Sequence, residues 1–349
     1  MPVSSPVPLR YDPQSWGFYR DPFSVYAALR AHAPVHREPL LDGELVCSTH
    51  ADVKAILRDP AFIPCDLAAS VSIHAGPGNT HLPAIQSALD ATVLLQSGQG
   101  HQLARRDFAR VLGQRTMRES GALAERLVTE LFADARARGG FDLVKDFADL
   151  LPFHFMAEFL GVPRTDVPFL MDCCERVVVA LFRRHCSRTE YVQLNSQIAL
   201  ALDHLESLFR ERRTRPREDG LTRMLRQEDG EATVSDRHLA ARVYFIFMVG
   251  VETTVTFLGS SLLALLENPE ETARWRQGDV GAETAVEELL RYTSPVQATL
   301  RVATAEREIR GVHVPPGQRV CALLASANRG NGAHRDPTRR LAPSSANHS

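Results

Sequence analysis

The sequence predicts a mainly helical protein with a small β region, and three observations lead to this prediction. Apolar residues recur at spacings of three and four through much of residues 100–210, which is the pattern of amphipathic helices. A long apolar segment, residues 235–267, lies between a capping serine and an Asn-Pro stop signal. Short strand-like runs fall near residues 34–50 and 300–325, so helices and strands do not alternate along the chain as they do in α/β proteins.

The N-terminal part is expected to form a helix, two strands and a second helix. Residues 21–34 carry the first helical pattern. Residues 34–41 and 44–50 are short strand-like runs joined by an Asp-Gly turn. Residues 51–60 form the next expected helix, and the proline at its end stops it.

Helices dominate the centre, and strands return towards the C-terminus. Four central helices are predicted, at residues 104–112, 122–135, 150–162 and 197–209. Gly140 and Gly161 stand where helices should stop. After the long segment come a helix at residues 282–292 and strands at residues 300–305, 307–314 and 318–325. Residues 330–349 have almost no apolar side chains and are expected to be a disordered tail.

The composition excludes several classes of protein. Forty basic residues face 42 acidic ones, and a net charge of -2 argues against nucleic acid or an acidic membrane as the partner. The apolar run at residues 243–251 stops at Glu252, short of the roughly 20 residues that span a bilayer. The six cysteines form no C-x-x-C pair, and the N-terminus lacks the pattern of a secretory signal. A cytoplasmic protein is expected.

A polar notch interrupts the long apolar helix at Gly250, Glu252, Thr253 and Thr254. Burying these groups without partners would cost several kcal/mol. One explanation is structural: the threonines bond back to carbonyls one turn earlier, while Glu252 pairs with an arginine or reaches solvent. The other is functional, because a glycine lets a planar ligand approach the backbone and a carboxyl beside a hydroxyl can relay protons.

Residues 249–254 resemble the central helix of the cytochrome P450 family. That family has a small residue, Gly, any residue, an acid, Thr, and Thr or Ser; Val249 departs mildly from the first position. Downstream, Glu288 and Arg291 match the family's E-x-x-R. The resemblance implies that this pair is buried and pins the loop carrying the haem-ligating cysteine.

The resemblance also implies haem b as the cofactor. Arg301 stands where the family places an arginine against a haem propionate, and His101 and Arg105 match the H-x-x-x-R that supplies two more propionate contacts. Gly250 would let the haem approach the helix. Electrons would come from a ferredoxin and a ferredoxin reductase.

The family's cysteine loop, F-x-x-G-x-x-x-C-x-G, is not found in residues 1–349. The expectation is therefore a single P450-like domain over residues 1–349 that lacks its C-terminal part, with no metal ligand assigned. Cys321 lies in a predicted strand. A thiolate on the iron drives oxygen chemistry, so the chain as printed is expected to be impaired.

The predicted function is P450-type haem monooxygenation of a small or carrier-bound organic molecule in bacterial secondary metabolism. Glu252 and Thr253 would deliver protons for oxygen activation. Two alternatives remain open. One is a haem-free P450-like auxiliary protein that stabilises a glycosyltransferase, and the other is an inactive remnant.

Overall fold

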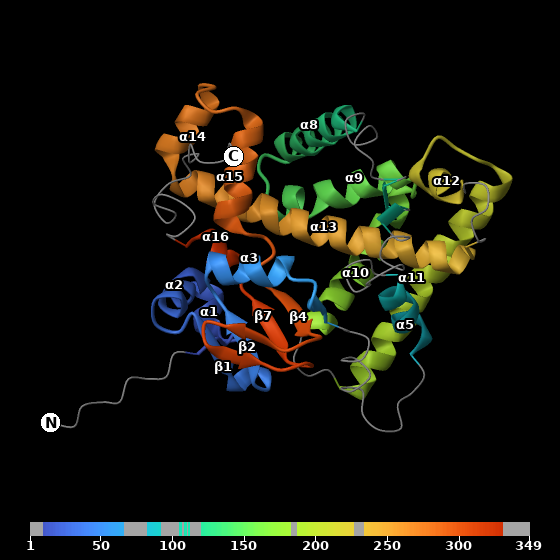
Figure 1. The fold of residues 1–349 in the computed structure, drawn as a ribbon. Coiled ribbons are helices and arrows are strands. Elements are labelled where there is room, and N and C mark those ends of the chain that lie inside the picture. Colours follow the sequence, from blue (N-terminus) through green and yellow to red (C-terminus); the bar gives the residue numbers. More distant parts are fainter. Residues whose placement is uncertain are drawn as a thin grey trace. The chain divides into compact units, whose positions relative to one another are not determined.

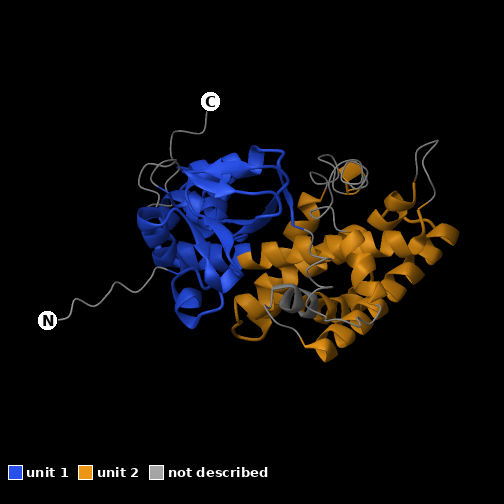
Figure 2. Ribbon diagram, turned by 60° about the horizontal axis from the view of Figure 1, so that its bottom comes forward, with its two compact units in different colours: residues 1–65, 257–349 blue, residues 66–256 orange. Residues whose placement is uncertain are grey.

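The structure is a computed structural model that describes residues 10–65, 82–91, 105, 106, 108, 109, 111, 120–182, 187–226 and 234–330. It divides into two compact units (Figure 2). The first comprises Met1–Cys65 and Phe257–Ser349, and the second comprises Asp66–Thr256. Helices predominate and strands are few, so the predicted fold class, mainly α with a small β region, is confirmed. The predicted tail lies outside the described residues from position 331 onwards.

The first unit contains the strands (Figure 1). Five of them form one sheet in the order β1-β2-β7-β4-β3. Their bounds are Val35–Glu38, Glu44–Cys47, Arg319–Ala322, Thr299–Ala303 and Phe62–Pro64 in that order. Strands β2 and β7 pair in parallel, with Val46 opposite Cys321, and the other pairs are antiparallel. Residues far apart in the sequence therefore meet in one sheet.

Both faces of this sheet are covered by apolar side chains. Leu45 and Cys47 point to a cluster that includes Val53 and Ile56 of α3, His50–Arg58. Val46 points the other way and packs with side chains that include Tyr26 and Leu29 of α2, Pro22–His32. Alternation along the strand sends successive side chains to opposite faces.

Turn chemistry explains where the strands end. Asp42 and Gly43 both have positive φ, 54° and 77°, as the Asp-Gly pair predicted. The predicted strand at residues 307–314 is in fact a hairpin of β5, Arg307–Ile309, and β6, Val312–Val314. Its turn contains Arg310 and Gly311, with φ of 50° and 78°.

The predicted strand at residues 318–325 is too long. It ends at Ala322, and Leu324–Asn328 form helix α16 instead. Arginines from two other helices hold α16: Arg30 donates to Ser326 O at 2.9 Å, and Arg291 donates to Asn328 O at 2.7 Å. These tertiary bonds override the strand pattern. The other helices of this unit are α1, Trp16–Arg20, α14, Pro269–Arg276, and α15, Ala282–Thr293.

The second unit is helical. Its helices are α5, Pro83–Asp90; α8, Gly121–Ala137; α9, Leu150–Leu160; α10, Val167–Phe182; α11, Arg188–Thr214; and α12, Gly220–Leu225. A π-helical turn, Val144–Ala148, precedes α9. The predicted helices at residues 122–135 and 197–209 lie within α8 and α11, and the one at residues 150–162 is α9, which ends earlier, at Leu160. Helices α5, α10 and α12 were not predicted, and part of the predicted helix at residues 104–112 lies outside the described residues.

The long helix α13, Asp236–Glu267, has the predicted bounds. His238 donates its backbone N–H to Ser235 Oγ at 3.2 Å, so the expected cap is present. Leu239–Phe247 are buried in the second unit, but Leu263 and Leu266 are 56% and 74% exposed. An apolar segment of this length predicts a helix that runs through the core along its whole length, and that prediction is wrong for its last turns. By length and composition alone, α13 is the one helix of the described residues that could cross a membrane, a test that buried core helices also pass.

A buried arginine joins three helix ends in the second unit. Arg212 of α11 is 1% exposed and donates to Asp219 Oδ2 and to Gly161 O, each at 2.7 Å. Asp219 also accepts the N–H of Thr222 at 2.8 Å, which caps α12. Gly161 ends α9 with φ of 89°, as predicted, and a Cβ there would lie 2.2 Å from Asp219 Oδ2. Glycine is therefore required at this position for both conformation and space.

Removing this arginine should be costly. Arg212→Ala leaves the Asp219 carboxylate and the Gly161 carbonyl unpaired, so the free energy of unfolding should fall by about 3–5 kcal/mol. Arg210→Ala is the matched control, because Arg210 lies on the same helix in an exposed pair with Glu206. Its cost should stay below about 1 kcal/mol. Urea denaturation measures both, and equal costs would contradict the role given to Arg212.

Candidate functional site

The two threonine hydroxyls of the notch in α13 are hydrogen-bonded within the helix itself. Thr253 Oγ1 donates to Val249 O at 2.9 Å, and Thr254 Oγ1 donates to Gly250 O at 2.7 Å. The structural explanation offered for the threonines is thus correct as far as their protons are concerned. Each hydroxyl oxygen still has lone pairs that can accept a hydrogen bond, so Thr253 can hold a water or a ligand donor.

Glu252 reaches solvent and forms no ion pair with a basic residue of the described chain. Partial desolvation raises the pKa of its carboxyl, and the carboxylates of Asp149 and Glu175 raise that pKa further. Asp149 precedes α9 and Glu175 lies on α10, so three helices contribute to this acidic environment. A carboxyl whose pKa is raised keeps its proton to higher pH and can act as a general acid.

Gly250 has room above it. A Cβ built at this position would meet only the Sδ and Cε of Met156, both at 3.7 Å, which is ordinary contact. Packing among the described residues therefore does not demand a glycine here. The space is compatible with the close approach of a ligand that the sequence suggested.

Glu288 and Arg291 form a buried two-pronged pair on α15. Arg291 Nε donates to Glu288 Oε2 at 2.8 Å and Nη2 donates to Oε1 at 2.7 Å. Their side chains are only 9% and 12% exposed. Arg291 Nη1 also donates to Asn328 O at 2.7 Å, so the pair holds the end of α16. Its role towards a haem loop stays a prediction.

Arg301 has donors to spare. It lies on β4, where its Nη1 donates to Thr299 Oγ1 at 2.8 Å and to Leu300 O at 2.9 Å. No hydrogen bond joins its Nε or Nη2 to the residues that the structure describes. Burial lowers the pKa of this guanidinium. A half-buried cation with unused N–H groups is suited to a carboxylate ligand.

Of the two other residues expected to bind a propionate, the structure describes only Arg105. His101 lies outside the described residues. Arg105 is helical, and its side chain is exposed. The structure thus groups Gly250, Glu252 and Thr253 within one turn of the second unit, while Glu288, Arg291 and Arg301 belong to the first.

Sequence reasoning missed Asp149, Glu175 and Met156. Met156 lies beside Gly250, and the charges of Asp149 and Glu175 act on Glu252 from other parts of the second unit; no local pattern marks such an interaction.

Three of the described cysteines, Cys47, Cys174 and Cys321, are poor thiolates because burial raises the pKa of each. Burial raises the pKa of Cys47 and of Cys321 to about 12, so both thiols keep their protons at neutral pH. Cys321 lies in β7, as predicted. The described residues contain no group of three or more His, Cys, Asp or Glu side chains that could hold a metal ion.

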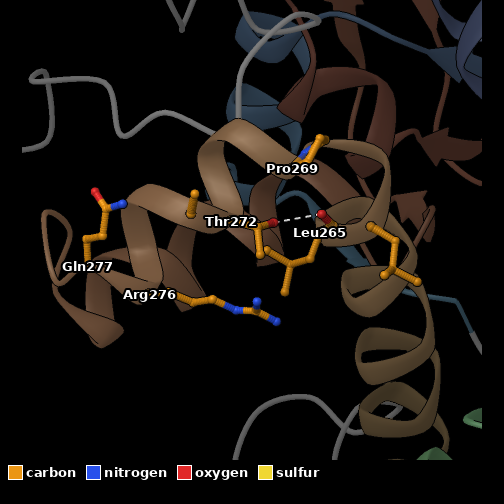
Figure 3. Close-up of a pocket in the computed structure, with 7 residues that line it drawn as sticks. Leu265, Pro269, Thr272, Arg276 and Gln277 are labelled. Carbon is orange, nitrogen blue, oxygen red and sulfur yellow. Dashed lines mark hydrogen bonds between the residues drawn. The ribbon is translucent and has the colours of Figure 1, made fainter.

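A groove elsewhere in the first unit holds none of the predicted site residues. Figure 3 shows it at the start of α14, where Thr272 Oγ1 donates to Leu265 O at 2.6 Å. Its lining is Leu265, Leu266, Pro269, Thr272, Ala273, Arg276 and Gln277.

The pair on α15 should contribute strongly to stability. Arg291→Ala leaves Glu288 and the Asn328 carbonyl without their partner, and the free energy of unfolding should fall by about 3 kcal/mol or more. Arg274→Ala is a matched control, since Arg274 forms an i,i+3 pair of the same kind with Glu271 but on the exposed surface. Thermal and urea denaturation compare them. A similar small loss in both variants would contradict the structural role of Arg291.

The charge environment of Glu252 predicts a pH effect. Its folded-state pKa is raised, so the folded chain binds more protons than the unfolded one, and the Glu252 contribution to stability falls as pH rises from about 4.5 through the folded-state pKa. Asp149→Asn with Glu175→Gln should lower the pKa of Glu252. Glu125→Gln, an exposed carboxylate on α8, should not. Carboxyl titration by isotope-edited infrared spectroscopy measures the shift.

Comparison with known proteins agrees with these features. The family model "Cytochrome P450" matches residues 165–278. Nocardicin C N-oxygenase of Nocardia uniformis is 30% identical, over 94% of this chain and 81% of that protein. The biotin biosynthesis cytochrome P450 of Bacillus subtilis is 27% identical, over 89% and 77%.

Solved structures agree as well. P450BioI, in complex with an acyl carrier protein ligated to hexadec-9Z-enoic acid, gives a TM-score of 0.80 at 26% identity, covering 92% of this chain and 81% of its own. The Bacillus subtilis bacillaene polyketide synthase cytochrome P450 PksS gives 0.82 at 25% identity, covering 97% and 84%. With a relative at 30% identity along nearly its whole length, this chain belongs to the cytochrome P450 family.

Proposed function

We propose that this chain has the residues for P450-type monooxygenation of a small organic molecule in bacterial secondary metabolism, and that residues 1–349 by themselves are impaired in it because the family's cysteine loop is not found among them. The observation that carries this proposal is the notch in α13. Glu252, whose pKa is raised, stands directly before Thr253, whose hydroxyl oxygen keeps free lone pairs. Relatives include the polyketide biosynthesis cytochrome P450 PksS and the cytochrome P450 monooxygenase PikC of Streptomyces venezuelae.

Members of this family bind haem b, and the residues present fit such a group. Gly250 leaves space for a planar ligand, and Arg301 has unused donors for a propionate. By resemblance, His101 and Arg105 would hold the propionates as well. Bound haem would supply the iron at which oxygen is activated.

The proton chemistry falls to two neighbouring side chains. Glu252 reaches solvent and keeps its proton to higher pH than an ordinary glutamate. The Thr253 hydroxyl donates its hydrogen bond to Val249 O, so its oxygen can accept a hydrogen bond from a water but cannot donate one to it. Glu252 would supply protons and Thr253 would hold the water that passes them on.

The partners follow from the same proposal. The substrate is a free small molecule or one bound to a carrier protein; P450BioI is a relative captured with an acyl carrier protein. Electrons would come from ferredoxin and ferredoxin reductase, with no nucleic acid or membrane partner, in the cytoplasm. We also propose that both compact units belong to one P450-like domain.

Haem-thiolate chemistry needs a cysteine thiolate; the family's cysteine loop is not found in residues 1–349, and burial raises the pKa of Cys47, Cys174 and Cys321. Residues 1–349 reconstituted with haem and reduced under CO should therefore lack the red-shifted Soret band of a thiolate complex. The measurement is an absorption spectrum. A clear thiolate band would contradict this prediction and assign the ligand to one of the six cysteines.

The proposed relay is tested in a form of the chain extended by a family-type cysteine loop. Thr253→Ala should lower the product formed per NADH consumed by about tenfold, with peroxide released instead, because the water-holding oxygen is lost. Thr254→Ala is the matched control: the next hydroxyl, bonded back in the same way, should leave coupling within about twofold.

Unchanged coupling in Thr253→Ala would remove the role given to the notch. Failure of the extended parent to retain haem would instead favour a haem-free auxiliary protein.

A further inference from the structure

Helix α1 of the first unit presents two large aromatic side chains to solvent. Trp16 is 76% exposed, more than any other large apolar side chain of the residues that the structure describes, and Tyr19 is 68% exposed. The two residues are three positions apart, so they lie on the same side of the helix. Tryptophan and tyrosine side chains that stand together on a surface are typical of binding sites, where they carry much of the binding energy.

The opposite side of α1 is anchored to the rest of the first unit. Phe18 packs edge-on against Tyr11 and Tyr26, with 5.6 Å between the ring centroids in each pair. Ser15 caps the helix, because its Oγ accepts the N–H of Phe18 at 3.3 Å. The two exposed rings are therefore carried by a fixed helix, and a ligand that binds them has little of α1 to order.

A segment with the chemistry to cover these rings precedes them in the sequence. Residues 2–9 read Pro-Val-Ser-Ser-Pro-Val-Pro-Leu, with three prolines and no charged side chain. Proline fixes φ near −65° and favours the polyproline II conformation, so little entropy is lost when such a segment binds. Docking on exposed aromatic rings is the usual way in which proteins recognise proline-rich segments.

This segment is attached close to α1. Tyr11 is buried, and its N–H donates to Glu38 Oε2 at 2.7 Å, so the chain is fixed directly after Arg10. The outer side of α1 is one helix diameter, about 10 Å, from its inner side. Eight residues in the polyproline II conformation span about 25 Å, so residues 2–9 can reach the exposed rings. A segment on so short a tether has an effective concentration in the millimolar range, which favours it over a second copy of the chain.

We infer that Trp16 and Tyr19 form a docking surface for a proline-rich segment in the polyproline II conformation, and that residues 2–9 of the same chain occupy it. The proline rings pack on the two aromatic rings and shield them from water. This surface is independent of the proposed function, because it involves neither the notch in α13 nor any residue expected to bind haem.

The fluorescence of Trp16 tests the docking. The chain has two tryptophans, so Trp275→Phe leaves Trp16 as the only one. Deletion of residues 2–9 in this background should move the emission of Trp16 to longer wavelength and raise its quenching by acrylamide about threefold, because the ring loses its cover. In a Trp16→Phe background, Trp275 reports on the rest of the first unit, and its emission should be the same with and without the deletion.

Two double variants of the undeleted chain separate the prolines from the rest of the segment. Pro6→Ala with Pro8→Ala should raise the quenching of Trp16 nearly as far as the deletion does, because the rigid proline rings are lost. Ser4→Ala with Ser5→Ala is the matched control, with the same number of changes and all prolines kept, and should leave the quenching at the parent value. These variants decide the matter if the deletion disturbs Trp275.

A synthetic peptide with the sequence of residues 2–9 supplies the occupant separately. At about 5 mM it should return the quenching of Trp16 in the deleted chain towards the value of the full chain. The full chain should not respond to the same peptide, because its own segment holds the surface.

Four results would overturn the inference. They are equal quenching of Trp16 in the full and the deleted chain, parent-like quenching after both proline substitutions, a deleted chain that ignores the peptide, and protection of Trp16 that grows with protein concentration. The last would assign a second copy of the chain as the occupant. A failed coupling test at Thr253 would remove the monooxygenase proposal and leave all these measurements unaffected.

Discussion

Polar groups at buried helix ends are the constraint on which this structure most depends. The last carbonyls and first N–H groups of a helix have no partner within it, and leaving them buried and unpaired is costly. Here side chains from distant helices satisfy them. Arg212 binds the carbonyl of Gly161 at the end of α9, Arg291 binds that of Asn328 in α16, and Asn195 caps α5. Each such bond also fixes how two helices pack.

Two further arginine side chains donate to backbone carbonyls at or next to α16. Arg30 donates to Ser326 O, and Arg329 donates to Tyr292 O at 2.7 Å. The guanidinium of Arg329 also stacks on the rings of Phe23 and Tyr292, at 3.3 and 3.9 Å from their centroids. Burial lowers its pKa to about 10, which still leaves it charged at neutral pH. The five-residue helix α16 is thus held by Arg30 and Arg291, which precede it in the sequence, and by Arg329, which follows it.

In the notch of α13 the polar side chains are hydrogen-bonded within their own helix and not by residues of distant helices. Its threonines satisfy their own protons inside the helix, so the polar groups cost little and the helix stays continuous. What remains available is an acceptor oxygen on Thr253 and a protonatable carboxyl on Glu252, whose pKa is raised by partial burial and then by the carboxylates of Asp149 and Glu175. The structural and the functional explanations of the notch are therefore compatible: the back-bonding that makes it stable leaves the groups that a relay needs.

The sequence by itself determined the helical class, the bounds of α13, the glycine stop at Gly161 and the family motifs around Glu252 and Glu288, because each is written in residues a few positions apart. Only the tertiary structure decided that α16 replaces the end of a strand, that the charges of Asp149 and Glu175 act on Glu252, and that Asn195 caps α5. The physical reason is distance along the chain. Periodicity and caps are local, whereas these contacts join residues that packing alone brings together.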